Sequence, residues 1–241
     1  MRRTGREGDH LIDNVHTVNF KLQALVAELS ETARLNWIWY IVRRPLVWVI
    51  ARELGRAAHT SLAGTFYRGR AFGAGEKPRS RDDFYWRQEA WETHVSAGKC
   101  KQDRYHEYLE RVLYLSSTIE TAHRESEEPS HISFIQRFEL GLPDLRAIIL
   151  DHKLEGKFPR LHFLLLNSEF LPGESYLLNP YRATHLLAYL CACFEIDAIE
   201  YPSVKVNFKK NPGDFNLVLF RKGVESARDM MVGGPFEYRP I

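Results

Sequence analysis

The chain has 241 residues, of which 44% are hydrophobic and 27% charged, and its formal net charge is +2. These values are ordinary for a soluble globular protein, and the near balance of acids and bases gives no electrostatic reason for nucleic-acid binding as a main activity. Three cysteines do not make a disulfide framework, and the polar N-terminus predicts no signal peptide, so we expect a cytoplasmic protein. The scattered histidines lack the spacing of a zinc site, and no metal is expected.

The first quarter of the chain is predicted to be helical. Hydrophobic residues recur at helical spacing from about Ile12 to Leu54, with a break or kink at Pro45. The most apolar run contains Arg43-Arg44-Pro45 and is too short and too charged to span a bilayer. The glycine-containing segment 55–64 predicts a boundary, with a helical region over 1–60 and a second domain over 61–241.

Strands and further helices are predicted along the second domain. Runs of β-branched or aliphatic residues predict strands over 65–72, 112–115, 132–138, 145–150, 161–166 and 216–220. Ser117 and Glu120 have the spacing of a capping box, and Asn179-Pro180 predicts the start of a helix that runs to Cys193. We predict no element after Phe220. Because helices and strands do not alternate regularly, the pattern indicates an α+β fold.

Three positions in these elements are candidates for a site. Arg68 lies inside an otherwise apolar strand, and Glu125 lies at the far end of the predicted helix that follows strand 112–115. Ser203 follows Pro202, which ends regular strand pairing and leaves the serine at a strand terminus. No motif supplies a base that would activate this serine as a nucleophile.

The segments around these positions resemble the RES family, which is named for its Arg, Glu and Ser. Members show an early Tyr-Arg, a Leu-Tyr-Leu-Ala-x-x-x-x-Thr-Ala-x-x-Glu run, and a late Tyr-Pro-Ser followed by Asn-Leu-Val-Leu-Phe. The corresponding segments here are Tyr67-Arg68, Leu113–Glu125, Tyr201-Pro202-Ser203 and Asn216–Phe220. The resemblance implies an ADP-ribosyltransferase-like fold with a split β-sheet core. It also implies an enzyme that breaks the nicotinamide–ribose bond of NAD by phosphorolysis or hydrolysis.

The resemblance also implies roles for individual residues. Glu125 would stabilise positive charge on the ribose ring, and Arg68 would bind the pyrophosphate in bidentate fashion. Tyr114 would stack on nicotinamide or shape its pocket. Ser203 would contact the ribose or orient Glu125, and Asn216 would support the strand that faces the site. NAD would be the substrate. Many members are toxins silenced by a helix-turn-helix antitoxin, so we expect a homo-oligomer or a complex. We expect no association with a membrane.

One departure from the family pattern keeps alternatives open. Members carry Gly-Arg-x-Asn just before the Leu-Tyr-Leu run, whereas this chain has Gly98-Lys99-Cys100-Lys101. Lys99 and Arg104 are the candidates to replace the second arginine, but lysine lacks the planar fork of a guanidinium. The alternatives are an ADP-ribosyltransferase that modifies a macromolecule and a catalytically inactive nucleotide-binding relative.

Overall fold

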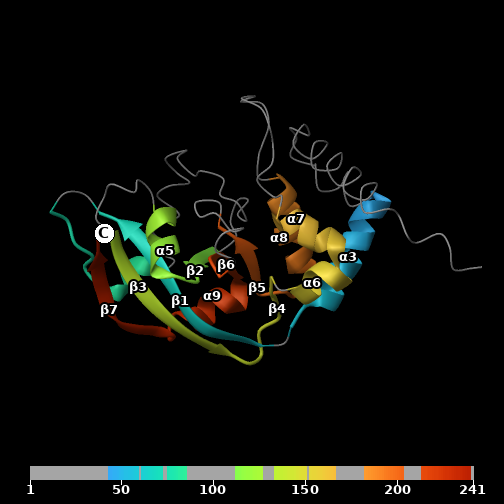
Figure 1. Cartoon of the computed structure of the whole chain (residues 1–241). Helices are drawn as coiled ribbons and strands as arrows, with labels where there is room; N and C mark the ends of the chain where they lie inside the picture. Colours follow the sequence, from blue (N-terminus) through green and yellow to red (C-terminus); the bar gives the residue numbers. More distant parts are fainter. Residues whose placement is uncertain are drawn as a thin grey trace, which may run out of the picture.

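The computed structural model describes residues 43–59, 61–72, 75–85, 112–126, 133–150, 152–166, 182–203 and 213–239 (Figure 1). In chain order, the elements of these residues are α3 (Pro45–Ala57), β1 (Leu62–Ala71), the 3₁₀ helix η1 (Arg81–Phe84), β2 (Val112–Ser116), α5 (Ile119–Glu125), β3 (Ser133–Leu142), β4 (Ala147–Ile148), α6 (His152–Lys157), α7 (Pro159–Leu166), α8 (Arg182–Cys193), β5 (Ala198–Pro202), β6 (Phe215–Phe220), α9 (Arg221–Ala227) and β7 (Met231–Tyr238).

All seven described strands join one sheet in the order β4-β5-β6-β2-β1-β3-β7. The β4–β5 pair is parallel, and the other pairs are antiparallel. The longest ladder joins β1 to β3, from Leu62 opposite Leu142 to Ala71 opposite Ser133. Helices are not interleaved regularly with parallel strands, and the predicted α+β class is therefore confirmed.

Hydrophobic residues cover both faces of this sheet. On one face, α3, α7 and α8 pack against β2, β5 and β6, and α5 covers β1 on the same face. On the other face, α9 packs against β2, β3 and β6. Figure 1 shows α3, α6, α7 and α8 gathered at the β4 end of the sheet, and α5 beside β1 and β3, toward the β7 end. Each fully buried leucine or isoleucine of this kind contributes about 1.5–3 kcal/mol.

The N-terminal helix α3 belongs to the first of these layers. Pro45 is its first helical residue, where the missing N–H costs nothing, and this agrees with the predicted break. Ile50 and Leu54 lie one turn apart and are fully buried against α7 and α8. The boundary predicted at residue 60 falls between α3 and β1, and it stays a prediction. No helix among the described residues is long and apolar enough to cross a membrane.

The structure corrects three elements of the prediction. Residues 161–166 were expected to form a strand but belong to α7, because Pro159 begins the helix and Leu161 and Leu165 bury the same helical face. A short apolar run cannot be assigned to helix or strand by periodicity alone. The predicted strand 145–150 pairs only at Ala147–Ile148. After Phe220, where we predicted no element, the chain forms α9 and β7.

Helix α5 approaches β1 very closely at Gly69. A Cβ atom at this position would lie 2.2 Å from the backbone oxygen of Ala122 and 3.0 Å from the Cβ of Ser126. Only glycine lets the helix lie this close to the strand, and the contact fixes the height of α5 above the sheet.

Gly69→Ala is therefore expected to lower the free energy of unfolding by about 1–3 kcal/mol, because backbone atoms must move to admit the methyl group. Chemical denaturation of the intact chain measures this change. Gly141→Ala is the matched control, because a Cβ on that strand glycine would meet nothing within 4 Å. Equal stability of Gly69→Ala and wild type would contradict the packing described here.

Candidate functional site

The turn from β2 into α5 is tied to the start of β6. Thr118 caps α5, because its hydroxyl oxygen accepts a hydrogen bond from the N–H of Thr121 at 3.1 Å. Ser117, which we predicted as the cap, instead donates to the carbonyl of Gly213 at 2.7 Å and accepts from the N–H of Phe215 at 3.0 Å. The predicted helix start is thus one residue early, because the Ser117 hydroxyl binds Gly213 and Phe215 instead of capping the helix.

The rest of α5 is attached to β3 and β7. His123 Nδ1 and Ser126 Oγ each lie 2.8 Å from Ser133 Oγ, at the start of β3. The Tyr238 hydroxyl donates to Glu120 at 2.7 Å, and its ring meets the His123 ring edge-on at 5.2 Å. These contacts hold both ends of a seven-residue helix that would not be stable alone.

The side chain of Glu125, at the end of α5, meets residues from two other strands. Ser203 Oγ donates to Glu125 Oε1 at 2.6 Å, and Asn216 Nδ2 donates to the same oxygen at 2.7 Å. Both donors are buried, whereas Glu125 is half-buried. No residue that the structure describes donates a hydrogen bond to the second oxygen, Oε2. Among the described residues, the carboxylate is therefore held through one oxygen only.

A fourth residue, absent from the predicted site, completes this chain of hydrogen bonds. Ser116 lies opposite Asn216 in the β2–β6 ladder, and its hydroxyl donates to Asn216 Oδ1 at 2.8 Å. Ser116 is also buried. The family run has alanine at this position, so the resemblance gave no reason to select the residue. Pairing the predicted strands 112–115 and 216–220 was the signal that would have found it.

The register of the sheet decides which predicted residues share a face with Glu125. Tyr67 lies opposite Ser116, and Gly69 contacts α5, so both residues face the site. Side chains alternate along a strand, and Arg68 therefore stands on the opposite face, which it shares with Phe66. The structure does not bring Arg68 to Glu125, and its predicted pyrophosphate contact stays a prediction.

Tyr114 does share the face of Ser116, two residues earlier on β2. Two residues of strand span about 7 Å, and Tyr114 packs against the hydrophobic layer of α3, α7 and α8. It thus lies between the Glu125 site and that layer. Lys99 and Arg104, the candidates for a second cation, lie outside the described residues.

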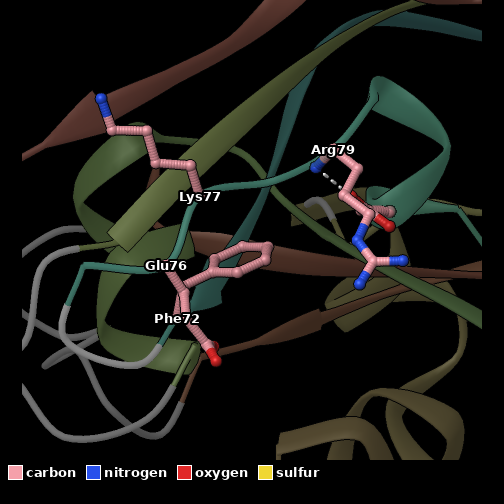
Figure 2. A pocket seen from close by; sticks show the side chains of 5 residues that line it. Phe72, Glu76, Lys77 and Arg79 are labelled. Carbon is pink, nitrogen blue, oxygen red and sulfur yellow. Dashed lines mark hydrogen bonds between the residues drawn. The ribbon is translucent and has the colours of Figure 1, made fainter.

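A separate cavity lies beyond the end of β1. It has a volume of about 350 Å³ and is lined by Phe72, Glu76, Lys77, Arg79 and Asp83. Figure 2 shows Lys77 and Arg79 on opposite sides of the Phe72 ring. This ring packs edge-on against Phe134, which is on the Arg68 face of the sheet. The cavity therefore belongs to the other side of the sheet from Glu125.

Neutral hydrogen-bond donors stabilise the Glu125 carboxylate. Glu125 is the last residue of α5, where the helix dipole disfavours a carboxylate. Two charge-assisted hydrogen bonds to Oε1 offset that disadvantage. Glu125 Oε1 therefore requires hydrogen-bond donors at positions 203 and 216. An acceptor at either position would place two oxygen atoms in repulsive contact.

Asn216→Asp tests this dependence. Near pH 7 the variant places two carboxylates at hydrogen-bond distance, and we expect a loss of about 3 kcal/mol in unfolding free energy. The loss should shrink from about pH 7 to about pH 4, because one shared proton restores a hydrogen bond. Asn216→Ala is the control, with a loss of about 1–2 kcal/mol that varies less with pH. A pH-independent loss in Asn216→Asp would contradict the direct contact between residues 216 and 125.

Tyr238→Phe tests the attachment of α5 to β7. The hydrogen bond from Tyr238 lowers the pKa of Glu120, and the same bond raises the pKa of Tyr238. A lowered carboxyl pKa stabilises the fold above its ordinary value, and this contribution is lost as the pH falls through the lowered value. The side chain of Glu120 is 41% exposed, so we expect at most about 1 kcal/mol after solvent screening.

The stability difference between wild type and Tyr238→Phe should therefore be largest near neutral pH and should fade in acid. Thermal unfolding at several pH values measures it. A difference that grows toward acid pH would contradict the assigned hydrogen bond.

No curated protein matches the chain. Among solved structures, the crystal structure of the M. tuberculosis MbcT–MbcA toxin–antitoxin complex is similar, with a TM-score of 0.47 and 11% sequence identity over 80% of this chain and 93% of that chain. The family model of the RES domain matches residues 77–239, which include Glu125, Ser203 and Asn216, and begins after Arg68.

This match covers more than half of the 241 residues and extends the resemblance through α9 and β7, past its predicted end at Phe220. The chain belongs to the RES domain family.

Proposed function

We propose that this chain is an NAD-consuming enzyme that cleaves the nicotinamide–ribose bond, with Glu125 as the group that carries the chemistry. The observation that supports this most is the asymmetric binding of the Glu125 carboxylate, with both described donors on Oε1. A carboxylate with one oxygen fixed and one available suits the stabilisation of a cation that forms during the reaction. RES family membership supplies NAD as the substrate class.

The proposed reaction needs no acid at the leaving group. When the bond between ribose C1′ and the pyridinium nitrogen breaks, its electron pair leaves with nicotinamide, which departs neutral. Positive charge then develops on the ribose ring, as in glycoside hydrolysis, and Oε2 of Glu125 stabilises it. Water attacks C1′ and loses a proton to give ADP-ribose, or phosphate attacks to give the ribosyl phosphate.

Ser203 acts as a positioning residue in this proposal. The residue is 2% exposed, and its hydroxyl donates to Glu125. A buried hydroxyl whose proton is engaged by a carboxylate is poorly placed to attack a bulky substrate. Of the two roles predicted for Ser203, contact with the ribose and orientation of Glu125, this geometry favours the second.

The remaining parts of the substrate site stay proposals. Tyr114 is the candidate to contact nicotinamide, because it lies on the face of Glu125. Arg68, Lys99 and Arg104 are retained as candidates for the pyrophosphate. A role as the toxin of a toxin–antitoxin pair, with a helix-turn-helix partner, rests on the family alone.

The experiment for the activity is nicotinamide release from NAD by the purified intact chain, with and without phosphate. Release that depends on phosphate identifies phosphorolysis, and release without it identifies hydrolysis. Labelled ADP-ribose on protein or nucleic acid would instead favour transfer to a macromolecule. A folded chain that binds NAD and releases no nicotinamide with any acceptor would sink the proposal and favour an inactive relative.

Glu125→Gln is expected to lower kcat by about 10²–10⁴-fold, because the amide removes the negative charge and keeps the shape. Glu120→Gln is the matched control on the same helix, since Glu120 contacts Tyr238 and Arg124 and not the site. Its kcat should equal that of wild type. If expression of the wild type arrests cell growth, Glu125→Gln should abolish the arrest. Equal loss in both variants would assign the effect to α5 as a whole.

A further inference from the structure

The activity proposed above uses Glu125, Ser203 and Asn216 and assigns no role to Ser116. The hydrogen bond from Ser116 to Asn216 gives this residue a role as well. It is buried at the end of β2, directly opposite Asn216 in the ladder with β6. Its hydroxyl donates to Asn216 Oδ1 at 2.8 Å, while Asn216 Nδ2 donates to Glu125 Oε1 at 2.7 Å. Three side chains thus form one continuous line of hydrogen bonds that ends on the carboxylate.

The direction of this line depends on how the Asn216 amide is turned. A half-turn of the amide would exchange its ends and set Oδ1 against Glu125 Oε1, two acceptors in repulsion. The Glu125 carboxylate, which only accepts, therefore selects the observed orientation, and in that orientation the Ser116 hydroxyl donates to Oδ1. This donation also polarises the amide, which strengthens the Nδ2–H donor toward Glu125.

We propose that Ser116 is a positioning residue for Glu125 and acts through Asn216. It keeps Oε1 bound and so directs Oε2 toward the reacting ribose. This inference rests on the proposed function for its catalytic consequence, but the coupling between Ser116, Asn216 and Glu125 is a property of the fold and can be measured without turnover.

The neighbouring serine provides a matched control. Ser117 makes two hydrogen bonds with the loop and strand start at residues 213–215, so its removal also breaks contacts between the β2 turn and β6. It makes no hydrogen bond to Asn216 or Glu125 among the described residues. A purely structural effect would be seen in Ser117→Ala as well as in Ser116→Ala.

Kinetics test the catalytic part. Ser116→Ala should lower kcat about tenfold, the order expected when a reacting group loses its fixed orientation, and KM should stay within about twofold. Ser116→Thr, which keeps the hydroxyl, should restore most of kcat, and Ser117→Ala should leave kcat unchanged. Wild-type kcat in Ser116→Ala, or an equal loss in Ser117→Ala, would overturn the inference.

Nuclear magnetic resonance tests the coupling itself. The side-chain amide signals of Asn216 should shift in Ser116→Ala and in Glu125→Gln, and should stay in place in Ser117→Ala. Unmoved signals in Ser116→Ala overturn the inference whether or not NAD is cleaved. Moved signals in a chain that cleaves no NAD would overturn the proposed function and still support the link from Ser116 to Glu125.

Discussion

The geometry of this protein depends on two hydrogen bonds that converge on one oxygen of Glu125. One comes from Ser203 at the end of β5 and the other from Asn216 at the start of β6, so three segments distant in the sequence meet at one atom. A carboxylate held in this way has a fixed position, and no described residue binds its second oxygen. The proposed chemistry requires both properties, because a developing ribosyl cation needs a fixed negative charge that is not already neutralised by a neighbouring cation.

Helix α5 carries this carboxylate, and most of its contacts serve to hold it in place. It has only seven residues, too few for stability in isolation, and it ends on a charge that its dipole disfavours. The close approach at Gly69, the cap at Thr118 and the contacts with Ser133 and Tyr238 offset these disadvantages. Functional sites commonly keep such locally unfavourable features where the surrounding fold can sustain them.

Sequence reasoning found the parts of the site that local chemistry determines. Pro202 ends β5 and thus places Ser203 at a strand terminus, and the apolar run that follows Asn216 forms β6 as expected. It missed Ser116, because selecting this residue requires the pairing of two strands that lie 100 residues apart in the sequence. Residues 161–166 were misassigned because a short apolar run suits either a helix or a buried strand. Arg68 precedes Gly69 on β1, so its side chain stands on the face of the sheet opposite to α5. No local sequence pattern shows which face of β1 the helix covers.

Glu125 is proposed to act in the cleavage of NAD and not in its binding. It stabilises positive charge on the ribose that forms only as the bond breaks. The most direct measurement of this claim is the affinity of Glu125→Gln for NAD by calorimetry, beside its turnover. The account predicts a dissociation constant within about threefold of wild type, with turnover lost. Undiminished turnover in this variant, or loss of NAD binding together with turnover, would contradict the assignment of Glu125 as the group that carries the chemistry.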